Sequence, residues 1–124
     1  MQALLIVAIA IHVLAGVFWA GSTFVLARGM QVSSPSLNRA QLGAALIAIA
    51  AGAALWVLVR LPLTLPSARV LAIGAACALL AAAVQVVQTA AGRDGTPERL
   101  LGQRAAAGLL AITVISMATA RYAW

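Results

Sequence analysis

Charged residues are scarce in this sequence of 124 residues. Only 8% of the residues are charged, lysine is absent, and the only side-chain carboxylates are those of Asp94 and Glu98. Soluble domains carry about a quarter charged residues, so this composition excludes a water-soluble fold. Both carboxylates stand outside the long apolar stretches, whereas a proton pump or a cation-coupled transporter normally needs an acidic residue within the membrane.

Residues that commonly carry catalysis are also rare. His12 is the only histidine and Cys77 the only cysteine. The sequence contains no Ser-His-Asp set, no CxxC pair and no glycine-rich phosphate loop. We therefore predict that the chain is not an enzyme. A single cysteine cannot form a disulfide within the chain, so Cys77 indicates no redox compartment.

Apolar residues make up 65% of the sequence, and the mean hydropathy is +1.08. They gather in four runs, which span residues 3–27, 40–59, 68–91 and 105–122. A helix needs about 20 apolar residues to cross a bilayer, and each run is close to that length. We predict an all-α fold, a four-helix transmembrane bundle that forms one domain over residues 1–124 and has the lipid bilayer as its solvent.

The boundaries of the runs carry further signals. The first run is too long for the apolar region of a signal peptide and has no basic segment before it, so it indicates an uncleaved first helix. Turn-forming residues separate the runs at positions 31–36, 61–67 and 92–95. Thr96 followed by Pro97 predicts the start of the fourth helix, with Thr96 as its N-cap.

Arginine supplies all eight basic residues and gives a net charge of +6. The arginines are dispersed at the ends of the apolar runs, which is typical of topology signals and headgroup anchors, so we predict no nucleic-acid partner. One side of the membrane would hold Arg28, Arg39, Arg93, Arg99 and Arg104, and the other side Arg60, Arg69 and Arg121. This bias predicts a cytoplasmic location for the first and third loops, with both termini outside.

Polar residues within the runs indicate contacts between helices. Trp19 and Thr23 share one face of the first run, and Gln85 and Gln88 lie about 60° apart on the third. All four stand toward the predicted cytoplasmic side at similar depth. We expect interhelical hydrogen bonds among them, each worth about 1 kcal/mol. The alternative is a polar path for an ion or a quinone headgroup.

Three soft metal ligands fall at one predicted depth. His12, Cys77 and Met117 each lie about three residues, or about 4.5 Å, outward of the middle of their runs. Imidazole, thiolate and thioether together suit copper, and histidine with methionine also suits haem iron. The alternative is structural: cysteine and methionine are ordinary core residues, and a neutral imidazole can donate to a carbonyl or hydroxyl of a neighbouring helix.

Small residues recur every four positions on two runs, from Ala44 to Gly52 on the second and from Gly74 to Ala82 on the third. This spacing favours a close approach of helix backbones. General alanine richness would produce the same pattern without any special packing role.

The first run also carries a family resemblance. His12 is followed by Trp19 seven residues later and by Gly21 two residues further, in a background of alanine and leucine. This arrangement resembles an early helix of the copper-resistance D (CopD) family. The resemblance covers the first helix and implies a small bacterial inner-membrane protein involved in copper transport or tolerance. It also implies that His12 contacts the metal.

Copper handling is therefore the function that we predict first, with copper as the cofactor and haem as the second choice. Two other functions stay open. The chain can instead be a non-catalytic structural or assembly subunit, packed in a larger membrane complex or in a homo-oligomer. It can also be a haem-binding electron-transfer subunit that uses His12.

Overall fold

The structure, a computed structural model, describes residues 1–29, 34–60, 62–93 and 96–123, and it contains no strand in these ranges. Its helices are α1 (Gln2–Ala27), α2 (Pro35–Val59), α3 (Pro66–Ala90), α4 (Pro97–Thr119) and the short 3-10 helix η1 (Ala120–Tyr122). All four α-helices are long and apolar enough to cross a membrane. The chain is an all-α four-helix membrane bundle, as its sequence predicts.

Three of the helices begin at a proline, which lacks the N–H that the first turn would leave unsatisfied. Thr96 caps α4 as expected, because its side chain accepts from the backbone N–H of Arg99. Ser34 caps α2 in the same way. Pro35 and Ser36, which were expected in the first loop, therefore form the first turn of α2. The rest of that loop (residues 31–33) and residues 94–95 lie outside the described residues.

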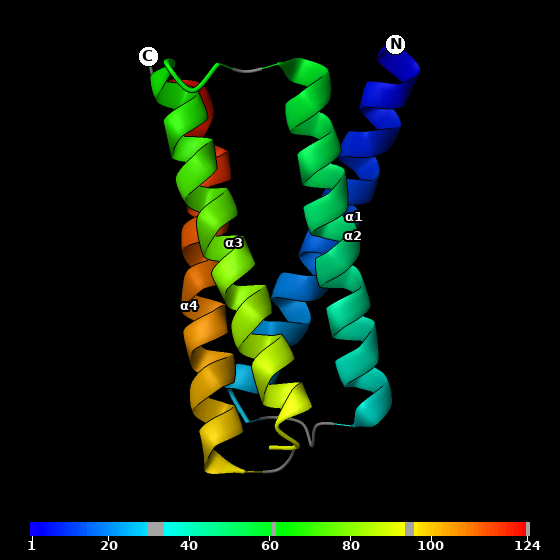
Figure 1. Ribbon diagram of the computed structural model, residues 1–124, viewed down its shortest axis with the longest axis vertical. Coiled ribbons are helices and arrows are strands. Elements are labelled where there is room, and N and C mark those ends of the chain that lie inside the picture. Colours follow the sequence, from blue (N-terminus) through cyan, green and yellow to red (C-terminus); the bar gives the residue numbers. More distant parts are fainter. Residues whose placement is uncertain (30–33, 61, 94–95, 124) are drawn as a thin grey trace.

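The bundle consists of two antiparallel hairpins, α1–α2 and α3–α4 (Figure 1). They converge at the end where each hairpin has its own connection, drawn at the bottom of Figure 1. They diverge at the opposite end, which carries both termini and the α2–α3 connection. We call the first end the polar end and the second the terminal end.

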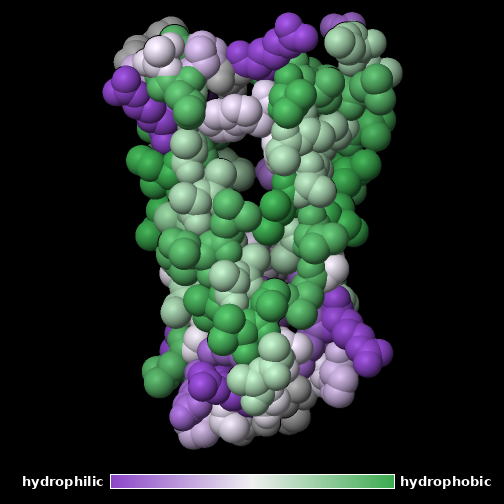
Figure 2. All heavy atoms as spheres, in the orientation of Figure 1, coloured by the Kyte–Doolittle hydropathy of each residue, from purple (hydrophilic) through white to green (hydrophobic). Residues whose placement is uncertain are grey.

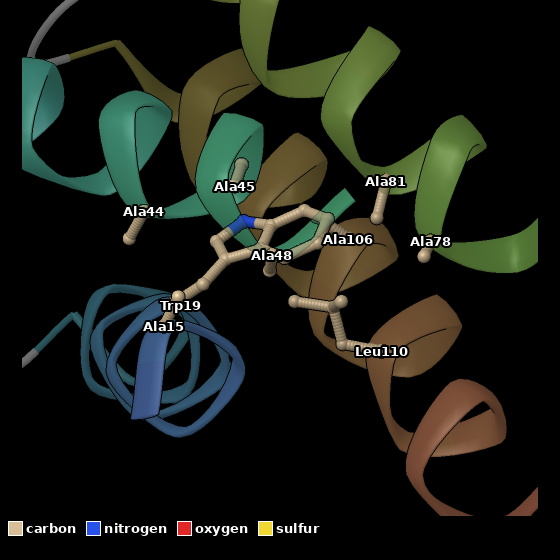
Figure 3. Packing of buried hydrophobic residues seen from close by; sticks show 9 residues of the cluster. All are labelled: Ala15, Trp19, Ala44, Ala45, Ala48, Ala78, Ala81, Ala106 and Leu110. Atoms are coloured by element: carbon tan, nitrogen blue, oxygen red, sulfur yellow. The ribbon is translucent and has the colours of Figure 1, made fainter. Parts of the chain in front are cut away.

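An apolar layer joins all four helices between the two ends. It consists of Ala15, Ala48, Ala78 and Leu110, one residue from each helix, and all are buried. Figure 3 shows the indole of Trp19 extending from α1 across this layer and Leu110 pointing toward it from α4. Because most of these residues are alanines, the helix backbones come close together at this level.

The next layer toward the terminal end is open. A step of seven residues along a helix returns to nearly the same face. Applied to the apolar layer, this step reaches Ala8, Leu55, Leu71 and Met117, which we call the open layer. None of these four residues is buried. Moreover, α1 has no buried residue before Ala15 and α2 none after Ala48. Figure 2 shows an opening between the hairpins in this half of the molecule.

The α3–α4 hairpin, in contrast, is packed along its whole length. A Cβ on Gly74 would lie 3.0 Å from the Cβ of Ser116, and Thr113 Oγ1 donates to the Gly74 carbonyl at 2.9 Å. Ala68 and Ala120 are buried near the terminal end of this hairpin. The small residue at position 74 therefore serves a close helix contact, and the opening arises because α1 and α2 lean away from α3 and α4.

Candidate functional site

Seven residues nearer the polar end, the same faces of α2, α3 and α4 carry amides in place of the apolar residues. Ala48, Ala78 and Leu110 are succeeded on their faces by Gln41, Gln85 and Gln103, and α1 contributes Thr23. We call Thr23, Gln41, Gln85 and Gln103 the polar layer. Each of the four is at most 2% exposed. Uncompensated amides at such positions would be costly, so their hydrogen bonds decide whether the layer is stable.

Gln85 lies at the centre of the polar layer. Its Oε1 accepts from Trp19 Nε1 at 2.7 Å, and its Nε2 donates to Thr23 Oγ1 at 3.0 Å. The same Nε2 lies 3.4 Å from Gln103 Oε1. One side chain of α3 thus contacts α1 twice and α4 once. The structure brings together Trp19, Thr23 and Gln85, which the sequence places at similar depth.

The remaining bonds bring α2 into the layer. Gln41 Nε2 donates to Thr23 Oγ1 at 2.8 Å, and Gln103 Nε2 donates to Gln41 Oε1 at 3.5 Å. Thr23 in turn donates to the Trp19 carbonyl at 2.7 Å. All four helices are therefore linked by side-chain hydrogen bonds at one level. The amides bond to one another, and the apolar layer follows directly toward the terminal end.

A second polar contact lies nearer the polar end. Arg99 Nη2 donates to Asn38 Oδ1 at 2.5 Å and thereby joins α4 to α2. Arg99 is only 5% exposed, so its interpretation as a headgroup anchor is wrong. Arg104 is exposed, but its Nε donates to the Ala27 carbonyl at 3.3 Å. It satisfies an acceptor at the C-terminal end of α1, where a cation also interacts favourably with the helix dipole.

Gln88 occupies a space that a glycine provides. Its Nε2 donates to the Glu98 carbonyl at 3.3 Å and so joins α3 to α4. A Cβ on Gly102 would lie 1.4 Å from that nitrogen. Gln88 Oε1 is buried and has no hydrogen-bond partner within the described ranges. Gln88 therefore contributes to helix association but is less well satisfied than Gln85.

His12 lies between α1 and α2, at a level between the apolar and open layers. Its Nδ1 is 2.8 Å from the Ala48 carbonyl. A carbonyl oxygen only accepts, so Nδ1 carries the hydrogen and Nε2 of the neutral ring keeps its lone pair. A Cβ on Gly52 would lie 3.0 Å from His12 Cε1 and 3.3 Å from Nδ1. The missing side chain at Gly52 makes room for the imidazole.

The other two predicted metal ligands belong to the α3–α4 hairpin. Cys77 is half-buried and precedes Ala78 of the apolar layer, and Met117 is 39% exposed in the open layer. The three soft ligands are therefore divided between the hairpins, with His12 on one and Cys77 and Met117 on the other. Within the described ranges, no group of three or more His, Cys, Asp or Glu side chains is placed to hold a metal ion.

Sequence reasoning missed four buried polar residues: Asn38, Gln41, Arg99 and Gln103. Gln41 stands at the edge of the second apolar run, and the other three precede an apolar run. The signal that finds them is a step of seven residues from buried apolar residues. On α2 it leads from Ala45 to Asn38 and from Ala48 to Gln41. On α4 it leads from Ala106 to Arg99 and from Leu110 to Gln103. Comparison of the chain with protein-family models, with curated proteins and with solved structures finds no match.

Proposed function

We propose that this chain is a small, non-enzymatic membrane protein that handles copper, in transport or in tolerance, with His12 as its first ligand. The observation that carries the proposal is the hydrogen bond from His12 Nδ1 to the Ala48 carbonyl. Histidines that bind metals almost always donate their second ring N–H to a carbonyl, carboxylate or water, which fixes the tautomer and orients the ring. Nε2 is the ligand atom in this arrangement.

Two further features support copper over a harder metal. The thioether of Met117 and the thiol of Cys77 lie on the hairpin opposite His12, and sulfur ligands with imidazole favour cuprous copper. No side-chain carboxylate occurs in the helix segments near this level, because Glu98 lies in the first turn of α4 and Asp94 precedes that helix in the sequence. Oxygen-preferring ions such as Mg²⁺ and Ca²⁺ would find no suitable ligands there.

The proposal includes a place for the protein. We propose the bacterial inner membrane, with both termini outside, which puts the polar end on the cytoplasmic side. The count of arginines supports this orientation. Reporters fused between Gly92 and Thr96 test it, and a reporter signal from outside the cell at that position would reverse the topology.

Elemental analysis tests the copper proposal. The protein would be purified in mild detergent from cells grown with added copper, and its metal content measured by mass spectrometry. We expect near-stoichiometric copper in the wild type and its loss in His12→Ala. Cys77→Ser and Met117→Leu establish which sulfur takes part, and Gly43→Ala is the control because its new Cβ would meet nothing within 4 Å. Copper that persists in His12→Ala would rule out His12 as the ligand.

A second candidate function is a structural or assembly subunit of a larger membrane complex. The observation that favours it is the polar layer, in which the amides form hydrogen bonds between helices instead of facing a ligand. A metal-free protein that retains a partner protein through mild detergent extraction would support this function. Iron together with a Soret band would instead indicate the haem-binding alternative.

A further inference from the structure

The opening between the hairpins needs an occupant. It lies in the terminal half of a membrane bundle, and its walls continue the apolar layer by one step of seven residues. The wall residues are Ala8, Leu55, Leu71 and Met117. The side chains of these four residues offer water no strong hydrogen-bond partner, whereas hydrocarbon gains dispersion contacts with them. An apolar occupant is therefore favoured over water.

The depth of the opening fits one leaflet of a bilayer. From Ala48 of the apolar layer to Val59 at the end of α2 there are eleven residues, or about 16 Å of helix. The hydrocarbon core of a bilayer is about 30 Å thick, so one leaflet contributes about 15 Å. The half of the bundle that contains the opening thus spans about one leaflet, which is the length of one acyl chain.

The shape of the opening favours an acyl chain over a helix. The backbones of the two hairpins lie closer together toward the apolar layer than at the terminal end (Figure 1). A transmembrane helix is a cylinder about 10 Å wide with its side chains and does not taper. A flexible hydrocarbon chain fills a narrowing space without leaving a void. A second copy of this chain fits the geometry less well for the same reason.

The rim of the opening is cationic. Arg60 at the end of α2, Arg69 in α3 and Arg121 in η1 are all exposed at the terminal end. Glu98 lies in the first turn of α4 at the polar end, where it pairs with Arg93, and Asp94 is outside the described residues. Among the described residues, no side-chain carboxylate neighbours these three arginines, and their charge matches that of a lipid phosphate.

We propose that an acyl chain of an anionic phospholipid occupies the opening between the hairpins, with its headgroup on the rim formed by Arg60, Arg69 and Arg121. The lipid is a resident of the metal-free bundle and holds the terminal halves of the hairpins apart. This proposal does not rest on copper binding, because it is argued from the opening and its rim, and it shares only the wall residue Met117 with the proposed copper site.

Lipid quenching tests the occupant. Single cysteines in a Cys77→Ser background would carry a bimane fluorophore at wall positions Leu55 and Leu71. Matched outer positions two residues away are Val57 (71% exposed) and Ile73 (57% exposed). The proteins would be reconstituted with phospholipids that carry a nitroxide on the acyl chain. We expect the wall positions to be quenched as strongly as the outer positions. Quenching confined to the outer positions would overturn the proposal.

The quenching measurement also distinguishes a lipid from other occupants of the opening. Protection of the wall positions together with a mass of two chains would assign the opening to a second copy. Protection in a monomer would mean that the hairpins close. Each hairpin carries one wall position and one outer position. If one variant fails to fold, the pair on the other hairpin still tests the proposal.

The headgroup class has its own measurement. Native mass spectrometry after mild detergent extraction would compare retention of phosphatidylglycerol with that of phosphatidylcholine. We expect preferential retention of the anionic lipid, and loss of this preference in the variant Arg60→Gln, Arg69→Gln, Arg121→Gln. The matched control, Arg28→Gln with Arg39→Gln, removes charge at the polar end and should keep the preference. Equal retention of both lipids by the wild type would refute the anionic headgroup.

Discussion

The two halves of this bundle lie in the same membrane but are held together differently. In the polar half, Thr23, Gln41, Gln85 and Gln103 link all four helices by side-chain hydrogen bonds. In the terminal half, the corresponding positions carry Ala8, Leu55, Leu71 and Met117, and the hairpins separate. On α2, α3 and α4 the two sets lie two seven-residue steps apart, with the apolar layer between them, so on these helices the comparison isolates the chemistry of the side chains from their place on the helix. On α1, Thr23 lies one residue beyond the corresponding position.

The difference follows from the solvent. In water, the aliphatic side chains of the open layer would bring the hairpins together, because burial removes apolar surface from water. In a bilayer, lipid tails are as apolar as leucine, so packing one apolar face on another gains little. Hydrogen bonds and close backbone contacts are what remain to drive helix association. The polar half has both between the hairpins. Beyond Ala48, the contact of Gly52 with His12 joins α2 to α1 but not to the other hairpin.

The largest effect is expected at the centre of the polar layer. Gln85→Leu keeps the volume of the side chain but removes the acceptor of Trp19 Nε1 and a donor to Thr23 and Gln103. We expect a loss of about 2–3 kcal/mol of unfolding free energy, because each buried group left unpaired costs about 1–3 kcal/mol. Unfolding by SDS titration in mixed micelles measures it. The neighbouring Val86→Leu is the control, and equal stability of the two variants would mean that the layer does not hold the bundle together.

A smaller effect is expected where Gln88 meets α4. Gly102→Ala places a Cβ 1.4 Å from Gln88 Nε2, so the amide must move and lose its bond to the Glu98 carbonyl. We expect a destabilisation of about 1–2 kcal/mol. Gly108→Ala on the same helix meets nothing within 4 Å and should gain up to about 1 kcal/mol from its backbone effect. We therefore expect the two Gly→Ala changes to shift the unfolding free energy in opposite directions in the same assay. Shifts in the same direction would contradict the structure.

The aliphatic residues of α4 test the comparison directly. Leu110 is 3% exposed in the apolar layer, whereas Met117 lies one step of seven residues away and is 39% exposed. We expect Leu110→Ala to cost about 1 kcal/mol, less than in a soluble core because the transfer term is absent in lipid. Met117→Ala should change the unfolding free energy by less than half as much. Similar losses at both positions would show that the terminal half is packed like the rest of the bundle.

Much of the fold was predictable because lipid imposes simple requirements. Each of the four apolar runs had to become a helix, since only helices satisfy backbone hydrogen bonds in a bilayer without a partner strand. The cap at Thr96 was predictable from its position before Pro97. The start of α2 at Pro35 was not, because counting apolar residues locates the hydrocarbon core and not the first turn of a helix in the headgroup region.

The candidate sites were predictable only in part, for a related reason. Trp19, Thr23 and Gln85 stand within apolar runs, where a polar side chain attracts attention. Gln103 and Arg99 precede the fourth run, where polar residues are ordinary, so only their register with Leu110 places them inside the bundle. The separation of the hairpins has no signal in any single helix, because it depends on which faces meet. For that reason His12 and Met117 share a predicted depth but belong to different hairpins.

The smallest effect on stability is expected at the contact between His12 and α2, where a spectroscopic readout is more sensitive. Gly52→Ala places a Cβ 3.0 Å from His12 Cε1, so the ring must shift by a few tenths of an ångström away from the Ala48 carbonyl. The weakened bond should offset the gain of about 1 kcal/mol that a Gly→Ala change brings in a helix, and leave the unfolding free energy nearly unchanged.

Nitrogen NMR of labelled histidine measures the tautomer. The wild type should show hydrogen on Nδ1, and Gly52→Ala should show a mixture, whereas Gly43→Ala should match the wild type. A wild-type ring with hydrogen on Nε2 would contradict the bond to Ala48 and remove the main support for His12 as a metal ligand through that atom.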